Sequence, residues 1–184
     1  NRNDHDVPIQ WVKFIKNSIV EIASNFTTKK MIEDYQEKYY NKLYKRTLAM
    51  RKNDFGLAKK LALWKIKISN NWDNVNVVSV NIPDIVKDTF QLGGKCPIEI
   101  ILNLKKLSPS NIGVEFIISD IQNMENKKLV YKKEFDLDRV ENGNAVYKAE
   151  ITLTKPGLYE YGFRIFPKHK DLPHRQDFRY IKWI

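Results

Sequence analysis

The side chains best suited to chemistry lie in the segment HKDLPH, where His169, Asp171 and His174 could together bind a metal ion. Their spacing matches no established metal site. Lys168 and Lys170 flank the first histidine and would repel a cation. We therefore interpret the segment as a solvated loop and predict no metal ligand in it.

A second group of titratable side chains, Glu33, Asp34 and Glu37, lies in a basic stretch of the chain. Lysines precede and follow these acids at helical spacing, which predicts ordinary ion pairs on a helix surface. Gly93-Gly94 is too short to cradle a phosphate group, and the sequence contains no phosphate loop, dinucleotide fingerprint or nucleophile elbow. We predict no catalytic and no cofactor-binding residue in this chain.

Composition narrows the classes of partner. The formal net charge of +10 would suit nucleic acid, but only seven of the 32 basic residues are arginines. Arginine dominates specific phosphate and base contacts, so we expect no nucleic-acid partner, and a basic nucleic-acid-binding protein is the weakest alternative. No apolar run approaches the roughly 20 residues of a membrane span, so we expect no membrane partner.

The single cysteine, Cys96, excludes an internal disulfide and a cysteine-rich zinc site, and indicates a reducing, cytoplasmic location. The polar start NRNDHDVP lacks the character of a signal peptide. From this start we expect the chain to be a piece of a longer protein.

Helical periodicity governs residues 1–74, where apolar side chains recur at spacings of three and four and predict three helices. The second helix begins in FTTKKMIEDYQEKYYNKLYK, residues 26–45, with Thr27 as its N-cap. The wide apolar faces predict packing residues: Trp11, Tyr35, Tyr39, Tyr40, Leu61 and Trp64.

Alternation of apolar and polar residues governs residues 75–184 and predicts about seven strands. It is clearest in the segments CPIEIILNL, IGVEFIIS, VYKAEITL and GLYEYGFRI. Further strands are expected near residues 75–80, 129–135 and 178–183. The predicted fold class is α+β, with a helical segment over 1–74 followed by an antiparallel, immunoglobulin-like β-sandwich over 75–184.

Five segments follow one another in an order that resembles the C-terminal end of the α-glucan phosphorylases, the glycogen, starch and maltodextrin phosphorylase family. The resemblance is to the short bacterial and archaeal branch, and it covers nearly the whole chain. One departure is Lys30, which stands where the family pattern has arginine. The segments are VPIQWVKFIKNSI (7–19), FTTKKMIEDYQEKYY (26–40), LALWKIKISNNWDNV (61–75), LKKLSPSNIGVEFII (104–118) and GLYEYGFRIFPKHKDL (157–172).

This resemblance implies that residues 1–74 are the C-terminal crossover helices of a GT-B glycosyltransferase fold, and that 75–184 form a β-extension. The implied parent is an enzyme of carbohydrate metabolism that transfers a glucosyl unit from an α-1,4-glucan to phosphate, releasing glucose 1-phosphate, with pyridoxal phosphate as cofactor. The family's cofactor lysine and phosphate-binding residues lie in motifs that no segment here resembles. We therefore expect the chain alone to be inactive and to close the missing catalytic lobes of the parent.

Two further expectations follow. The main alternative function is a non-catalytic glucan-binding β-sandwich, for which Trp72, Tyr131 and Trp183 are the candidate sugar platform. Without catalytic lobes to cover them, the aromatic helix faces should seek another partner. We therefore expect the isolated chain to form a symmetric homodimer through the helix at 26–48.

Overall fold

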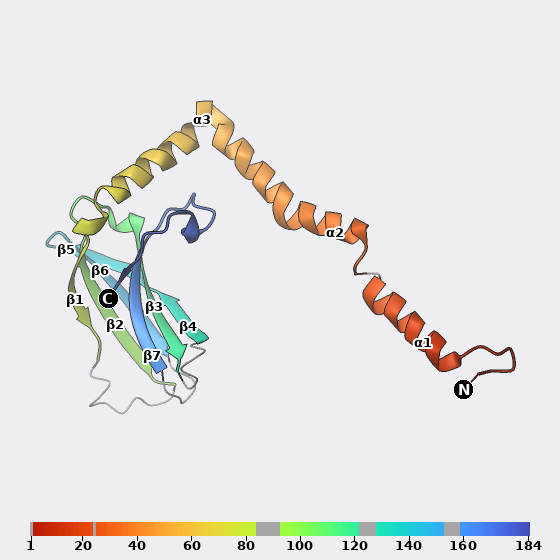
Figure 1. Cartoon of the computed structure of the whole chain (residues 1–184). Coiled ribbons are helices and arrows are strands. Elements are labelled where there is room, and N and C mark those ends of the chain that lie inside the picture. Colours follow the sequence, from red (N-terminus) through yellow and green to blue (C-terminus); the bar gives the residue numbers. More distant parts are fainter. Residues whose placement is uncertain (1, 24, 84–92, 122–127, 153–158) are drawn as a thin grey trace. The chain divides into compact units, whose positions relative to one another are not determined.

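The computed structural model describes residues 2–23, 25–83, 93–121, 128–152 and 159–184. The chain divides into two compact units, Asn1–Lys60 and Leu61–Ile184. Figure 1 traces the helices of the first unit in red to orange and the strands of the second in yellow-green to blue.

The described part of the first unit is helical, apart from an isolated β-bridge between Arg2 and Pro8. Its elements are α1 (Ile9–Ser18), the π-helical turn η1 (Ile19–Ala23), α2 (Thr28–Tyr35), the π-helical turn η2 (Gln36–Tyr40) and the first part of α3 (Asn41–Ser69). The predicted N-cap is confirmed: Thr27 is extended, and its Oγ1 accepts a hydrogen bond of 3.1 Å from the backbone N–H of Lys30. This bond satisfies one of the free N–H groups of the first helical turn.

The expected division into three helices is not confirmed. Elements α2, η2 and α3 follow one another directly from Thr28 to Ser69, but within α3 the backbone leaves helical dihedrals at Lys52–Phe55. Asn53, Asp54 and Phe55 have φ of 52°, 51° and 60°, in the left-handed region. Asn and Asp tolerate this region, whereas a phenylalanine there is uncommon. The break lies within α3, several residues before the second unit begins.

The second unit contains two four-stranded antiparallel sheets. One has the order β1 (Asn76–Asn81), β2 (Lys95–Asn103), β6 (Asn144–Thr152), β5 (Asp136–Glu141). The other has the order β4 (Lys128–Glu134), β3 (Ile112–Asp120), β7 (Tyr159–Pro167), β8 (Lys182–Trp183). The α+β class and the antiparallel strands are confirmed, and the described residues form eight strands where about seven were expected.

Alternation in the sequence accounts for the core of this unit. In β2 every second residue from Cys96 to Leu102 is buried, as the period of a half-buried strand requires. The same core receives the end of α3, from which Leu61, Trp64 and Ile68 are buried. The indole N–H of Trp64 donates a 3.1 Å hydrogen bond to Asn111 Oδ1, so its polar atom is satisfied. The last helical turns therefore cover part of the strand core.

Two predicted strands differ from those observed. The strand expected at 178–183 is shortened to Lys182–Trp183, because η5 (Arg175–Asp177) and an irregular stretch precede it. The strand expected near 129–135 is β4, and a second strand that was not expected, β5, follows it after Phe135 and pairs with β6. Every residue of β5 is exposed, so no alternation marks it in the sequence.

Candidate functional site

An open groove of about 910 Å³ lies on the sheet that contains β2, β5 and β6. Its lining includes Glu99 of β2, Asp138 of β5 and Lys148 of β6. Cross-strand pairing explains their proximity, because Lys148 lies directly opposite Glu99 and is also the partner of Asp136 at the start of β5. Sequence reasoning did not identify this groove.

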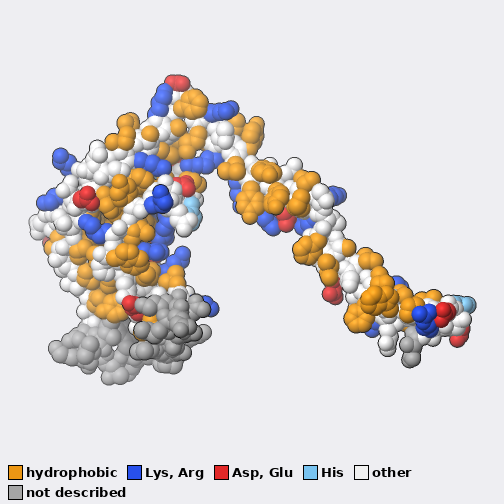
Figure 2. All heavy atoms as spheres, viewed as in Figure 1, with side chains coloured by type: hydrophobic (Ala, Val, Ile, Leu, Met, Phe, Trp, Pro, Cys, Tyr) orange, Lys and Arg blue, Asp and Glu red, His pale blue; other side chains and the backbone are white. Residues whose placement is uncertain are grey.

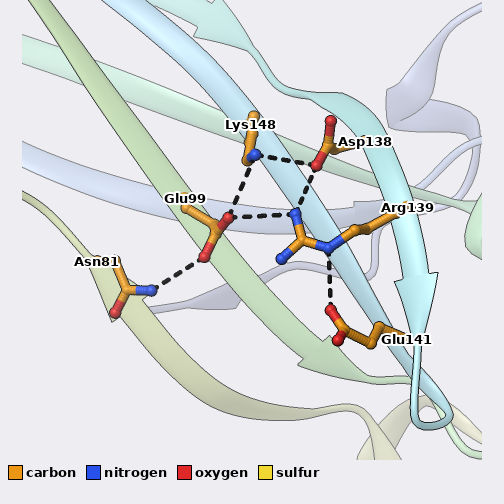
Figure 3. Close-up of polar contacts among 6 residues, drawn as sticks. All are labelled: Asn81, Glu99, Asp138, Arg139, Glu141 and Lys148. Carbon is orange, nitrogen blue, oxygen red and sulfur yellow. Dashed lines mark hydrogen bonds and ion pairs between the residues drawn. The ribbon is translucent and has the colours of Figure 1, made fainter.

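Charged side chains at the groove form one connected network, shown in Figure 3. Arg139 contacts Asp138 at 2.7 Å and Glu141 at 3.0 Å, and Lys148 lies 3.0 Å from Asp138. Glu99 lies 3.6 Å from both cations and accepts a 3.1 Å hydrogen bond from Asn81.

The ionisation of this network argues against acid catalysis. The hydrogen bond from Lys148, followed by that from Arg139, lowers the pKa of Asp138 below its ordinary value. A general acid needs a raised pKa, which this environment does not supply. None of the described residues that line the groove is aromatic, so it also lacks a flat ring for a sugar. The groove is a polar surface stabilised by its own ion pairs.

The predicted sugar platform is not assembled. Trp72 is only 4% exposed and packs against Tyr180 with ring centroids 5.6 Å apart. The prediction that Trp72 forms an exposed platform is therefore wrong. Tyr131 is partly buried in β4. Trp183 is 59% exposed in β8 and alone offers an open indole face. Strands β3 and β7 lie between β4 and β8, so Tyr131 and Trp183 are on opposite edges of the sheet.

Both histidines of HKDLPH accept hydrogen bonds from backbone N–H groups. His169 Nδ1 accepts a 3.2 Å hydrogen bond from the N–H of Asp171, and its ring packs 4.8 Å from that of Trp64. His174 Nδ1 accepts a 3.1 Å hydrogen bond from the N–H of Gln176. Within the parts of the chain that the structure describes, no three potential ligands are grouped to hold a metal ion.

The acidic residues of α2 behave as the sequence predicts. Asp34 pairs with Lys38 at 2.9 Å and with Lys30 at 3.2 Å, and Lys29 lies 3.9 Å from Glu33. The hydrogen bonds from Lys38 and then Lys30 lower the pKa of Asp34. The ion pairs predicted for Glu33 and Asp34 are confirmed, and the lowered pKa of Asp34 makes it unsuited to act as a general acid; Glu37 lies in η2, outside these pairs.

The six predicted packing residues fall into two sets. Leu61 and Trp64 are buried within the second unit. The other four are on the first unit and are exposed: Trp11 by 64%, Tyr35 by 46%, Tyr39 by 57% and Tyr40 by 60%. Figure 2 shows orange, hydrophobic side chains along these helices.

Tyr35, Tyr39 and Tyr40 form a cluster, which we call the tyrosine surface. The ring of Tyr35 lies 6.2 Å from that of Tyr39 and 6.3 Å from that of Tyr40. These separations are within the range of edge-on aromatic contacts. A contiguous aromatic surface on a helix is typical of a site that another protein surface covers.

One buried charge was missed by sequence reasoning. Glu115 of β3 is 2% exposed, and Arg175 binds it with two hydrogen bonds of 3.0 and 3.2 Å. Arg164 also binds it, through Nε at 2.5 Å and through Nη2. Burial by itself would raise the pKa of Glu115, but the hydrogen bonds from Arg175 and Arg164 outweigh burial and lower it.

The sequence contains a sign of the contacts among Glu115, Arg164 and Arg175, but it can be used only when the pairing of the strands is known. Glu115 interrupts an apolar strand, and the pairing of β3 with β7 places it opposite Arg164. Arg175 comes from η5 and has no fixed spacing to either residue. A carboxylate bound by two guanidinium groups remains ionised, so it stabilises the fold and is not a proton donor.

Within the described parts of the chain, no helix has both the length and the apolar character that crossing a bilayer requires.

Comparison with known proteins identifies relatives of this chain. Residues 72–184 match the model of a family described as the glycogen phosphorylase C-terminal domain. The chain is 28% identical to the maltodextrin phosphorylase of Thermococcus litoralis over 191 residues, which cover 95% of this chain and 20% of the relative. It is 36% identical to the glycogen phosphorylase of Aquifex aeolicus over 44 residues, covering 24% of this chain and 6% of that relative. The chain thus spans about a fifth of the length of the first of these relatives.

Proposed function

The chain belongs to the glycogen phosphorylase C-terminal domain family, and on this premise we propose that it is the C-terminal part of an α-1,4-glucan phosphorylase. The similarity over 95% of the chain to one fifth of a maltodextrin phosphorylase carries this proposal. The parent would transfer glucosyl units from an α-1,4-glucan to phosphate and release glucose 1-phosphate.

We propose that residues 1–74 are the crossover helices of the parent's GT-B fold and that residues 75–184 are its β-extension. The strand order β1-β2-β6-β5 and β4-β3-β7-β8 supports an immunoglobulin-like sandwich for the extension. In that fold the first, second, fifth and fourth strands of the basic seven make one sheet, and the remaining three make the other. An extra strand after the third, here β4, gives the order observed.

The proposed role of the helices is to cover the catalytic lobes of the parent. The tyrosine surface supports this role, because Tyr35, Tyr39 and Tyr40 are exposed on helices in which no residue is buried. Tyrosine suits such a contact, since its ring supplies apolar area and its hydroxyl finds a polar partner. The ion pairs of Asp34 with Lys30 and Lys38 would border the contact.

The parent would need pyridoxal phosphate, but the described residues of this chain do not fit that cofactor. A lysine that binds an aldehyde cofactor is activated by desolvation, and no lysine among the described residues is buried. We therefore assign no step of the reaction to this chain and propose that it is inactive alone.

Absorbance and activity measurements test this assignment. After incubation with pyridoxal phosphate and removal of free cofactor, the chain should retain no stoichiometric absorbance and should form no glucose 1-phosphate from glycogen. If the chain retained bound cofactor, and if substitution of a single lysine removed it, the proposal that catalysis belongs to the rest of the parent would be wrong.

A second candidate function is glucan binding by the sandwich, favoured by the exposed indole of Trp183. Gel electrophoresis in the presence of glycogen separates this candidate from the first. Retardation that a Trp183→Ala variant abolishes would support glucan binding. Equal mobility with and without glycogen would leave the structural role as the function of this region.

Two further properties belong to the same proposal. The parent would be cytoplasmic, which the single buried cysteine Cys96 suits. The isolated chain would form a homodimer through the tyrosine surface, because two-fold pairing is the commonest closed arrangement of a self-complementary surface.

A further inference from the structure

A second cavity, of about 410 Å³, lies in the sandwich unit beside the buried Glu115. Four cationic side chains line it: Lys132 of β4, Arg164 of β7, Arg175 of η5 and Arg179. We call this cavity the basic pocket. It lies wholly within the second unit and is separate from the groove around Glu99.

The charge of the basic pocket is unbalanced. None of its described lining residues is acidic, and within the described parts of the chain Arg164 and Arg175 both pair with Glu115. Four cations minus one carboxylate leave an excess of three positive charges. These cations repel one another, and an anion that enters the pocket would reduce this repulsion.

Hydrogen-bond donors remain available in the pocket. Arg164 and Arg175 each use two nitrogens to contact Glu115, which leaves further N–H groups on each five-donor guanidinium. Arg175 is also stacked, with its guanidinium carbon 4.2 Å from the ring centroid of Phe166. Because Glu115 and Phe166 fix this guanidinium in advance, an anion that binds it does so with little further loss of side-chain entropy.

The lining also indicates the class of anion. Guanidinium groups match the oxygens of phosphate in paired hydrogen bonds, and a doubly charged phosphate offsets most of the excess charge. The pocket is larger than a bare phosphate needs, and Phe178, Tyr180 and Ile181 supply an apolar wall. We propose that the basic pocket binds a phosphate group, either as inorganic phosphate or as the phosphomonoester of a small organic molecule.

This proposal does not depend on the assignment of the parent enzyme, because it concerns binding by the sandwich alone. Calorimetric titration of the full chain with sodium phosphate tests it, against sodium chloride at equal ionic strength. Glucose 1-phosphate serves as the phosphomonoester probe and glucose as the uncharged control. Both phosphate compounds should bind and glucose should not. A higher affinity for glucose 1-phosphate would identify the ester, and a higher affinity for inorganic phosphate would identify the free ion.

Matched variants locate the site. Arg179→Gln and Lys132→Gln remove exposed side chains of the pocket that are not bonded to Glu115, so the fold should persist. Each should weaken binding by about tenfold, the value of one charge-assisted hydrogen bond. Arg51→Gln and Lys106→Gln make the same changes of charge at exposed positions elsewhere and should leave affinity unchanged. Absence of binding at millimolar phosphate, or equal losses in all four variants, would overturn the proposal.

Discussion

The ring of Phe166 lies directly against Gly113, so closely that a Cβ at residue 113 would be 2.4 Å from the ring atoms. The two residues are opposite each other in the pairing of β3 with β7. The guanidinium of Arg175 stacks on the ring of Phe166 and binds Glu115. The absence of a side chain at Gly113 therefore allows the packing on which the buried ion pairs depend.

Substitution at Gly113 should be costly. In Gly113→Ala the new methyl group would displace the Phe166 ring, and overpacking of this kind costs about 1–3 kcal/mol. Urea denaturation measures the change in the free energy of unfolding. Gly162→Ala is the matched control in β7, because its Cβ would lie 3.7 Å from Trp183, an ordinary contact. Equal losses in the two variants would contradict the steric account.

Removal of the buried charge should destabilise the second unit. Glu115→Gln leaves Arg164 and Arg175 without their shared carboxylate, and breaking a buried pair costs on the order of 3 kcal/mol. Glu134→Gln is the surface control, since Glu134 pairs with Lys168 at 2.5 Å in a more exposed setting. The control should lose less than about 1 kcal/mol in the same measurement.

The pKa of Glu115 also predicts a pH dependence. It is lowered in the folded protein, so the ion pairs contribute fully above the unfolded value of about 4.3. Their contribution should decline as the pH falls below that value towards the folded pKa. Thermal unfolding between pH 7 and pH 3 should show a smaller loss of stability in Glu115→Gln than in the unchanged chain. Parallel curves would exclude Glu115 as a source of acid sensitivity.

Cys96 should be unreactive in the native protein. It is 3% exposed in β2, and burial raises the pKa of its thiol, so little of the nucleophilic thiolate is present. A thiol reagent that develops colour should react with one equivalent per chain in denaturant and only slowly without it. Rapid labelling of the native chain would show that β2 opens readily.

Self-association should depend on the tyrosine surface. Tyr39→Glu introduces a charge among exposed aromatic rings and should weaken a dimer strongly, as light scattering at micromolar concentration would show. Lys106→Glu, which introduces the same charge on an exposed turn of the second unit, is the matched control and should leave association unchanged. If the unchanged chain and both variants were all monomeric, the proposal that this surface pairs with itself would be wrong.

Local pattern predicted some elements of the fold and not others. Alternation identified β2, β3, β6 and β7, because each buries one face or more in the core. It could not identify β5, whose residues are all exposed and which exists through its pairing with β6. The sequence pattern ended the second helix at residue 48, before the break at Lys52–Phe55, but nothing local in it indicated the φ of 60° at Phe55.

The candidate sites also differ in whether local sequence pattern could predict them. Helical spacing placed Trp64 and Tyr39 on apolar faces but could not tell that Trp64 is buried in the second unit and that Tyr39 is exposed on the first. The sites built around Glu115 and Glu99 depend on which strands are neighbours, and this is a non-local property. Side-chain type alone therefore identified the loop histidines as candidates and missed the buried carboxylate.

We propose that this chain completes the catalytic lobes of a phosphorylase, and reconstitution of activity from two separate parts is the measurement that decides it. The rest of the parent would be expressed without this chain and assayed for glucose 1-phosphate formation from an α-1,4-glucan, before and after the chain is added. We expect little activity before addition, recovery with the unchanged chain, and no recovery with Tyr39→Glu. Full activity without the chain, or equal recovery with Tyr39→Glu, would contradict it.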